Sequence, residues 1–176
     1  KALPMVREED GGRLFCRQVH TLSTADLTPA FKDDDPTRAE EAEQLAERAC
    51  LVFAFLSYAY LRAGAVERSE LPPALAVPWH AAATYLGRAM SLDYVSTVLT
   101  NCVVDETEGG GRLGEVTVGA TFTGTRDEAH FYALHARIEA AAAPAVQAML
   151  RVLEPPAAVD AAVLAAALED VAKGVR

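Results

Sequence analysis

The most restrictive feature of this sequence is an almost unbroken apolar run, ACLVFAFLSYAYL, at residues 49–61. The run is shorter than the ~18 residues that an apolar helix needs to cross a bilayer. It ends a longer stretch, residues 37–63, whose first half is acidic and opens with a Thr-x-x-Glu capping box. A helix that is apolar nearly all round is surrounded by other elements. We therefore predict a long helix over residues 37–63 that is buried among further helices.

Prolines and capping residues divide the middle of the chain. Three prolines predict an irregular segment at residues 67–78, and a helix is expected to begin after it, at Trp79. Another helix is expected at residues 92–104, with Ser91 as its cap. The alternating sequence EVTVGATFT predicts one short strand at residues 115–123.

The C-terminal third carries the clearest helix signals. The sequence TRDE at residues 125–128 is a second capping box, and it predicts a long helix that Pro144 kinks and that ends at Pro155. A last amphipathic helix is expected at residues 157–174. Residues 1–35 are predicted to form an irregular arm with one short strand or helix. The fold class is therefore mainly α, with a minor strand element.

Composition and charge narrow the class of protein. The hydrophobic fraction is 51% and the net charge is -9, which argues against a surface for nucleic acid or an anionic membrane. Three scattered cysteines, Cys16, Cys50 and Cys102, are typical of a reduced cytoplasmic protein and lack the spacing of a zinc site. We expect an acidic cytoplasmic protein without nucleic-acid or membrane partners.

Two helix faces carry the candidate functional residues. In HFYALHARIEAAAAP, residues 130–144, His135 shares a face with Phe131, Leu134 and Ile138, whereas His130 lies on an outer flank. The pattern alone leaves two interpretations of His135, a hydrogen-bonded core residue or a chemical group. In the helix expected at residues 92–104, one face holds mixed side chains that belong to the core or to a ligand wall; these are Tyr94, Thr97 and Val98.

Three segments, in this order, resemble the indoleamine 2,3-dioxygenase family of haem proteins. LPPALAVPW at residues 71–79 resembles the family's LP-x-x-x-AVP stretch. LDYVSTVLTN at residues 92–101 is similar to its Y-A-x-x-V-L-x-N-W helix, with Cys102 in place of the tryptophan. Residues 122–146 resemble its F-x-G-x-x-D-E-x-x-F-x-x-V segment. The resemblance extends from about Glu43 to the end of the chain, and it implies a helical bundle of the indoleamine/tryptophan dioxygenase type.

The resemblance also implies roles for individual residues. Tyr94, Thr97, Val98 and Phe131 fall on substrate-binding positions, and Tyr94, Val98 and Phe131 also on the distal side of the haem. His135 falls on the catalytic position that faces the haem and the indole nitrogen. The mammalian indoleamine enzymes have serine there, whereas a histidine is more like tryptophan 2,3-dioxygenase. The resemblance thus favours His135 as the chemical group.

The implied function is a haem-dependent dioxygenase that inserts O2 across the indole 2,3 double bond of tryptophan or a related indole and gives a formylkynurenine-type product. A haem monooxygenase, a non-catalytic haem- or indole-binding protein and a plain helical interaction domain are the alternatives. Residues 1–70 are expected to form an arm and small helical domain, and residues 71–176 the distal helices of an incomplete large domain. No residue here matches the family's iron-ligating histidine, which is expected beyond Arg176. Haem b is therefore expected to need the C-terminal half as a partner and to be missing or weakly held by these residues alone.

Overall fold

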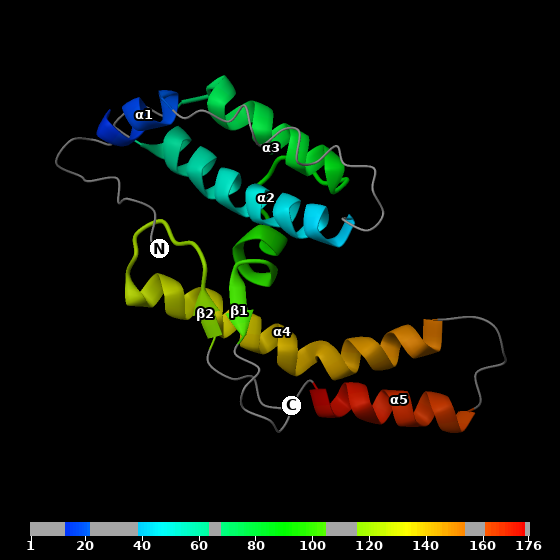
Figure 1. The fold of residues 1–176 in the computed structure, drawn as a ribbon. Helices are drawn as coiled ribbons and strands as arrows, with labels where there is room; N and C mark the ends of the chain where they lie inside the picture. Colours follow the sequence, from blue (N-terminus) through cyan, green and yellow to red (C-terminus); the bar gives the residue numbers. More distant parts are fainter. Residues whose placement is uncertain (1–12, 22–38, 64–67, 105–115, 154–160, 175–176) are drawn as a thin grey trace.

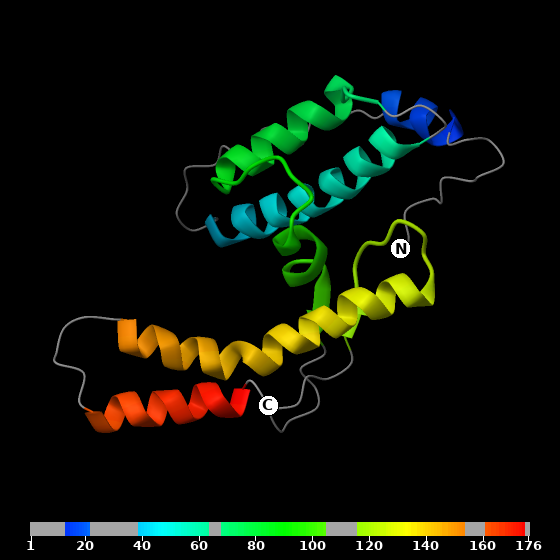
Figure 2. The same ribbon diagram turned by 180° about the vertical axis from the view of Figure 1, so that it is seen from behind.

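The computed structural model describes residues 13–21, 39–63, 68–104, 116–153 and 161–174, and it is mainly α-helical, as predicted (Figure 1). Its elements in chain order are α1 (Arg13–His20), α2 (Ala39–Arg62), α3 (Pro73–Tyr85), the π-helical turn η4 (Val95–Leu99), β1 (Cys102–Val104), β2 (Val116–Val118), α4 (Arg126–Leu153) and α5 (Ala161–Gly174). Figures 1 and 2 show α1, α2 and α3 packed together on one side and the pair α4 and α5 on the other. The turn η4 and the two strands lie between these groups.

The apolar helix α2 is buried on two sides, which agrees with its sequence. Its Phe53 and Cys50 face α1 and α3, whereas Leu51 and Phe55 face η4 and α4. The first core consists of Phe15, Cys16, Val19, Ala46, Cys50, Phe53, Ala54, Tyr60, Ala63, Leu75, Trp79, Ala82 and Ala83. The second core consists of Leu51, Phe55, Val98, Ala120 and Tyr132. Because α2 contributes to both cores, it connects the two groups of helices.

Helix α3 begins earlier than the prolines suggested. The expectation of an irregular segment up to Pro78 is wrong, because the helix starts at Pro73, behind Pro72 in an extended conformation (φ -66, ψ 151). A proline in the first helical turn loses no hydrogen bond, since the amides there have no partner within the helix. Pro78 lies inside the helix and removes one amide donor, but it is buried in return.

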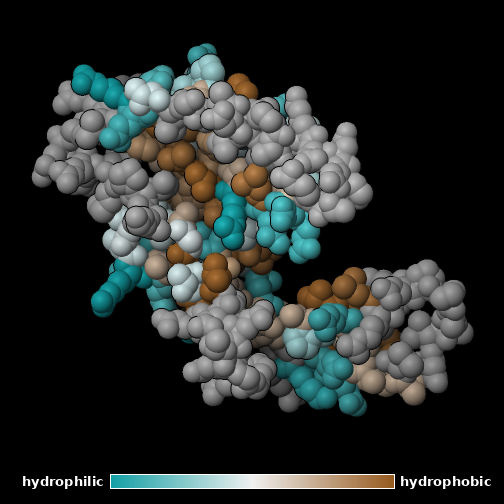
Figure 3. All heavy atoms as spheres, viewed as in Figure 1, coloured by the Kyte–Doolittle hydropathy of each residue, from teal (hydrophilic) through white to brown (hydrophobic). Residues whose placement is uncertain are grey.

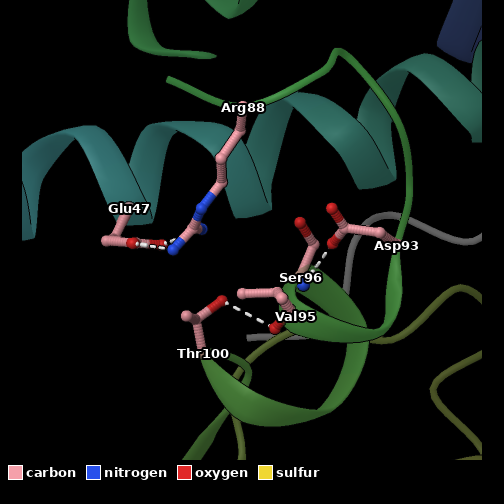
Figure 4. A network of polar contacts seen from close by, with 6 residues as sticks. All are labelled: Glu47, Arg88, Asp93, Val95, Ser96 and Thr100. Carbon is pink, nitrogen blue, oxygen red and sulfur yellow. Dashed lines mark hydrogen bonds and ion pairs between the residues drawn. The ribbon is translucent and has the colours of Figure 1, made fainter. Parts of the chain in front are cut away.

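The helix expected at residues 92–104 is replaced by η4 followed by β1. Asp93, and not Ser91, caps the turn: its carboxylate accepts a hydrogen bond from the Ser96 amide at 2.8 Å (Figure 4). The turn closes when the Val95 carbonyl accepts from the Thr100 amide at 2.9 Å. The chain then extends as β1, which pairs antiparallel with β2 so that Cys102 lies opposite Val118. The strand predicted at residues 115–123 corresponds to β2, whereas β1 was missed because a short β-branched run is ambiguous between helix and strand.

The loop between α3 and η4 is tied back to α2 by an ion pair. The Arg88 guanidinium and the Glu47 carboxylate form a two-pronged contact, in which Nη1 donates to Oε2 at 2.6 Å and Nη2 to Oε1 (Figure 4). Such forked pairs fix the geometry of both side chains. The loop that leads to η4 therefore has a defined position against α2.

The predicted capping box at the start of α4 is present in a modified form. The Glu128 amide donates to the Thr125 hydroxyl at 3.3 Å, as the motif requires. The Glu128 carboxylate reaches further back and accepts from the amides of Phe122 and Thr123, both at 2.7 Å. Helix α4 continues through Pro144 to Leu153 and packs beside α5 (Figure 1). The expected helix end at Pro155 lies outside the described residues.

Among the described residues, no helix is both long enough and apolar enough to cross a membrane. The described cysteines Cys16, Cys50 and Cys102 carry free thiols.

Candidate functional site

An exposed apolar face runs along α4 on the side that does not pack on the second core. Phe131 is 55% exposed, Leu134 45% and Ile138 53%, although each is a large apolar side chain. The neighbouring Tyr132 is 8% exposed and belongs to the second core, so the helix has a clear inner and outer side. Figure 3 shows hydrophobic side chains at the surface over the C-terminal half of α4 as well. An apolar face of this extent is typical of a surface that receives a ligand or another protein segment.

His135 lies on this face between two aromatic rings. Its ring centroid is 4.3 Å from that of Phe131, in a tilted arrangement, and 6.2 Å from that of Tyr94, in an edge-to-face arrangement. Edge-to-face and tilted pairs at these distances are favourable contacts between rings. His135 is half-buried.

The hydrogen bond of His135 fixes which ring nitrogen carries the proton. Nδ1 lies 2.8 Å from the carbonyl oxygen of Phe131, one helical turn earlier. A carbonyl oxygen only accepts, so Nδ1 is the donor. In the neutral imidazole Nε2 then carries a lone pair and accepts. Nε2 has no hydrogen-bond partner within the described part of the chain, and it is therefore free to accept a proton donor from a ligand.

Tyr94 reaches His135 from η4, and its hydroxyl is held by a residue that the sequence did not single out. The hydroxyl donates to Glu139 Oε1 at 2.8 Å. This hydrogen bond to a carboxylate raises the pKa of the Tyr94 phenol, with smaller contributions from desolvation and from the Glu139 charge. Glu139 lies one turn beyond His135 on α4 and was missed because its contact crosses from one element to another. The only signal in the sequence was its spacing of four from His135.

The structure does not bring Thr97 and Val98 to His135 together with Tyr94. Val98 is 2% exposed and packs in the second core, whereas the Thr97 hydroxyl donates to the Asp93 carbonyl at 2.9 Å. The expectation of a shared face assumed a regular α-helix, whereas the segment forms a π-helical turn in which Tyr94 is exposed and Val98 is buried. Their roles toward a ligand remain predictions. His130, by contrast, is exposed on the flank of α4, as its position in the helix predicts.

The base of α4 is fixed by Glu128. Burial alone raises the pKa of this carboxyl, but hydrogen bonds from the Thr123 hydroxyl, from two backbone amides and from the Tyr132 hydroxyl outweigh it and lower the pKa. Burial and the Glu128 charge together raise the pKa of Tyr132 to about 12. Glu128 is thus an anion at neutral pH and serves the helix rather than a ligand. No group of three or more metal-ligating side chains occurs among the described residues.

Comparison with known proteins agrees with the sequence motifs. Residues 35–176 match the family model described as Indoleamine 2,3-dioxygenase. A protein of Saccharomyces cerevisiae named indoleamine 2,3-dioxygenase is 38% identical over 112 residues, which cover 61% of this chain and 24% of the yeast protein. The matched region thus amounts to about a quarter of that curated relative.

Proposed function

Because this chain belongs to the indoleamine 2,3-dioxygenase family, we propose that it forms the distal wall of a haem pocket in which an indole is oxidised by O2. The observation that carries the proposal is His135, whose Nε2 is free to accept on an exposed apolar face between the rings of Phe131 and Tyr94. An indole is large, flat and apolar and has a single N–H donor. An aromatic wall with one acceptor is the minimum that recognises it.

The described residues fit one wall of a haem site. Phe131, Leu134 and Ile138 expose apolar side chains on one face of α4, which suits a flat macrocycle or the indole held against it. His20 and His80 lie on α1 and α3, and we propose that neither ligates iron; His20 Nε2 instead lies 3.2 Å from the Tyr60 hydroxyl. The iron ligand is expected from another segment of the native protein. When bound, the haem supplies the activation of O2.

The proposed reaction adds both oxygen atoms of O2 to the substrate. The indole C2–C3 bond breaks, C2 becomes a formamide carbonyl and C3 a ketone, and no other oxidant or reductant is consumed. In this reaction we assign three tasks to the residues of this chain. Phe131 contacts the indole plane, His135 Nε2 accepts the indole N–H, and Tyr94 limits the movement of the His135 ring. Such contacts raise the reaction rate mainly by orienting the reacting atoms.

The proposal is tested by absorption spectroscopy and product analysis of the native protein, as purified and after addition of haem. We expect a Soret band that shifts with carbon monoxide after reduction and shifts again when tryptophan or another indole is added. We also expect a product that is heavier than the substrate by two oxygen atoms, both from labelled O2. A product with one added oxygen would indicate the monooxygenase alternative, and indole binding without product would indicate a non-catalytic binding protein.

Several finer predictions belong to this proposal. The substrate is expected to be tryptophan or a related indole, and the enzyme is expected in the cytoplasm, since the described thiols are free. The division into residues 1–70 and 71–176 also remains a prediction. In the described structure, α3 shares the first core with α1 and α2.

A further inference from the structure

The Asn101 side chain joins η4 to the segment that leads into α4. It is 1% exposed; its Nδ2 donates to the Ala120 carbonyl at 2.9 Å, and its Oδ1 accepts from the Ala120 amide at 2.7 Å. A primary amide has the donor and the acceptor of a peptide group. Asn101 therefore pairs with Ala120 as a neighbouring strand would, and it extends the contact between β1 and β2 by one side chain.

The same amide also holds the end of η4. The second proton of Nδ2 is donated to the Thr97 carbonyl at 3.1 Å. All hydrogen-bonding atoms of the buried amide are then in use, which is the condition under which a buried polar group stabilises one arrangement of its neighbours. Asn101 thus contacts the backbone of η4 at Thr97 and the backbone of the segment before α4 at Ala120.

Gly119 allows the segment before α4 to approach the backbone of Asn101 closely. Its amide donates to the Asn101 carbonyl at 2.7 Å. A Cβ at this position would lie 3.3 Å from Asn101 Oδ1 and 3.4 Å from its carbonyl oxygen. Any larger residue would therefore push the two segments apart by a few tenths of an ångström. We call Asn101, Gly119 and Ala120 the Asn101 joint.

Two sets of polar contacts hold the neighbourhood of Tyr94. One is the exposed hydrogen bond from Tyr94 to Glu139 of α4, and the other is the buried Asn101 joint, which ties η4 to the segment before α4. An exposed hydrogen bond competes with water, whereas a buried amide that loses its partners has no substitute. The joint therefore holds η4 in place, and the Tyr94 contact depends on that placement.

We infer that Asn101 is a positioning residue: through the Asn101 joint it sets the position of Tyr94 relative to His135 and Phe131. The inference rests on the proposed function, because it assigns to Asn101 the alignment of an indole against His135. Asn101 itself does not touch the substrate. Its loss should lower kcat much more than it weakens indole binding, since the apolar face of α4 remains.

The test uses Asn101→Asp in the native haem-loaded protein. The aspartate keeps an acceptor for the Ala120 amide but sets an oxygen against the carbonyls of Ala120 and Thr97. We expect kcat to fall at least tenfold, while the dissociation constant for the indole changes less than threefold. Gly119→Ala is the second variant, because it opens the same joint without a buried charge; it should lower kcat about two- to fivefold. Leu75→Val, in the first core, is the control for a general loss of stability, and it should leave kcat unchanged.

A double-mutant cycle separates positioning from a merely structural role. Tyr94→Phe should lower kcat severalfold in the wild-type background and less than twofold in the Gly119→Ala background. Faster hydrogen exchange at the amides of Gly119 and Ala120 should accompany the loss, with no change in haem content. Effects of Tyr94→Phe and Gly119→Ala that multiply, or an equal loss in Leu75→Val, would overturn the inference. A wild-type protein that neither binds nor oxidises an indole would instead refute the proposed function, so the two failures are distinguishable.

Discussion

Replacement of His135 by alanine is the sharpest test of the apolar face of α4. The change removes the acceptor that lies between the rings of Phe131 and Tyr94. The indole N–H would then lie unpaired against apolar side chains, which costs about 1–3 kcal/mol. Since ~1.4 kcal/mol corresponds to a factor of ten, we expect kcat/KM to fall roughly fivefold to a hundredfold. Haem binding should not change, because His135 is not assigned to the iron.

The assay compares steady-state oxidation of tryptophan and of its 1-methyl derivative. The methylated substrate has no proton to donate, so it should be oxidised equally well by the wild type and by His135→Ala. His130→Ala is the matched control, since it removes an exposed histidine from the same helix. His135→Gln keeps an acceptor and should recover part of the loss. If His135→Ala oxidises tryptophan as fast as the wild type, His135 is only a packing residue and the proposed role is refuted.

Three further predictions concern stability and reactivity. Glu128→Gln should weaken the stability of the fold at neutral pH, and denaturant titrations should show a smaller loss of stability on acidification than in the wild type. The sign follows from the lowered pKa of Glu128: its contribution is complete above the pKa of an unfolded carboxyl and is lost as the pH falls through the folded value. An unchanged acid profile would contradict the role of Glu128 in capping. Phe55→Ala should lower the free energy of unfolding by about 3–5 kcal/mol, because Phe55 is fully buried, and a urea titration that gives less than 1 kcal/mol would place it outside the core. Burial, together with the nearby Glu47 charge, raises the pKa of the Cys50 thiol to about 11, so that about one molecule in a thousand carries the thiolate at pH 8. Mass spectrometry after alkylation should find Cys102 labelled before Cys50, and the reverse order would refute the burial of Cys50.

The long helices of this fold are predictable because their signals are local. The apolar run in α2 and the capping box before α4 each specify an element without help from the rest of the chain. The middle of the chain is different. Pro73 and Pro78 each predict a break in the helix, but the first needs no amide donor and the second is compensated by burial. The end of the segment at residues 92–104 became a strand because β2 offers a partner there, and pairing across the chain outweighs local propensity.

The candidate site, too, was predictable only where its contacts lie within one helix. The neighbourhood of Phe131 and His135 was visible in the sequence, because residues four apart on a helix share a face. The contact of Tyr94 with Glu139 was not visible, because it joins two elements whose relative position depends on the second core. The resemblance implied a ligand wall at Val98, whereas in the structure Val98 packs in that core from within the π-helical turn.

The attachment of Glu128 at the base of α4 acts at a distance. His135 lies seven residues beyond it, which is about 10 Å along the axis at a rise of ~1.5 Å per residue. If α4 tilts about its N-terminal end, the pivot is the cluster of hydrogen bonds around the Glu128 carboxylate. A tilt of about 5° at the pivot would move the His135 ring by about 0.9 Å, and a misplacement of about 1 Å is enough to cost a reaction two orders of magnitude. Under the proposed function, the Glu128 carboxylate would thus help to set the orientation of His135 toward an indole without contacting it.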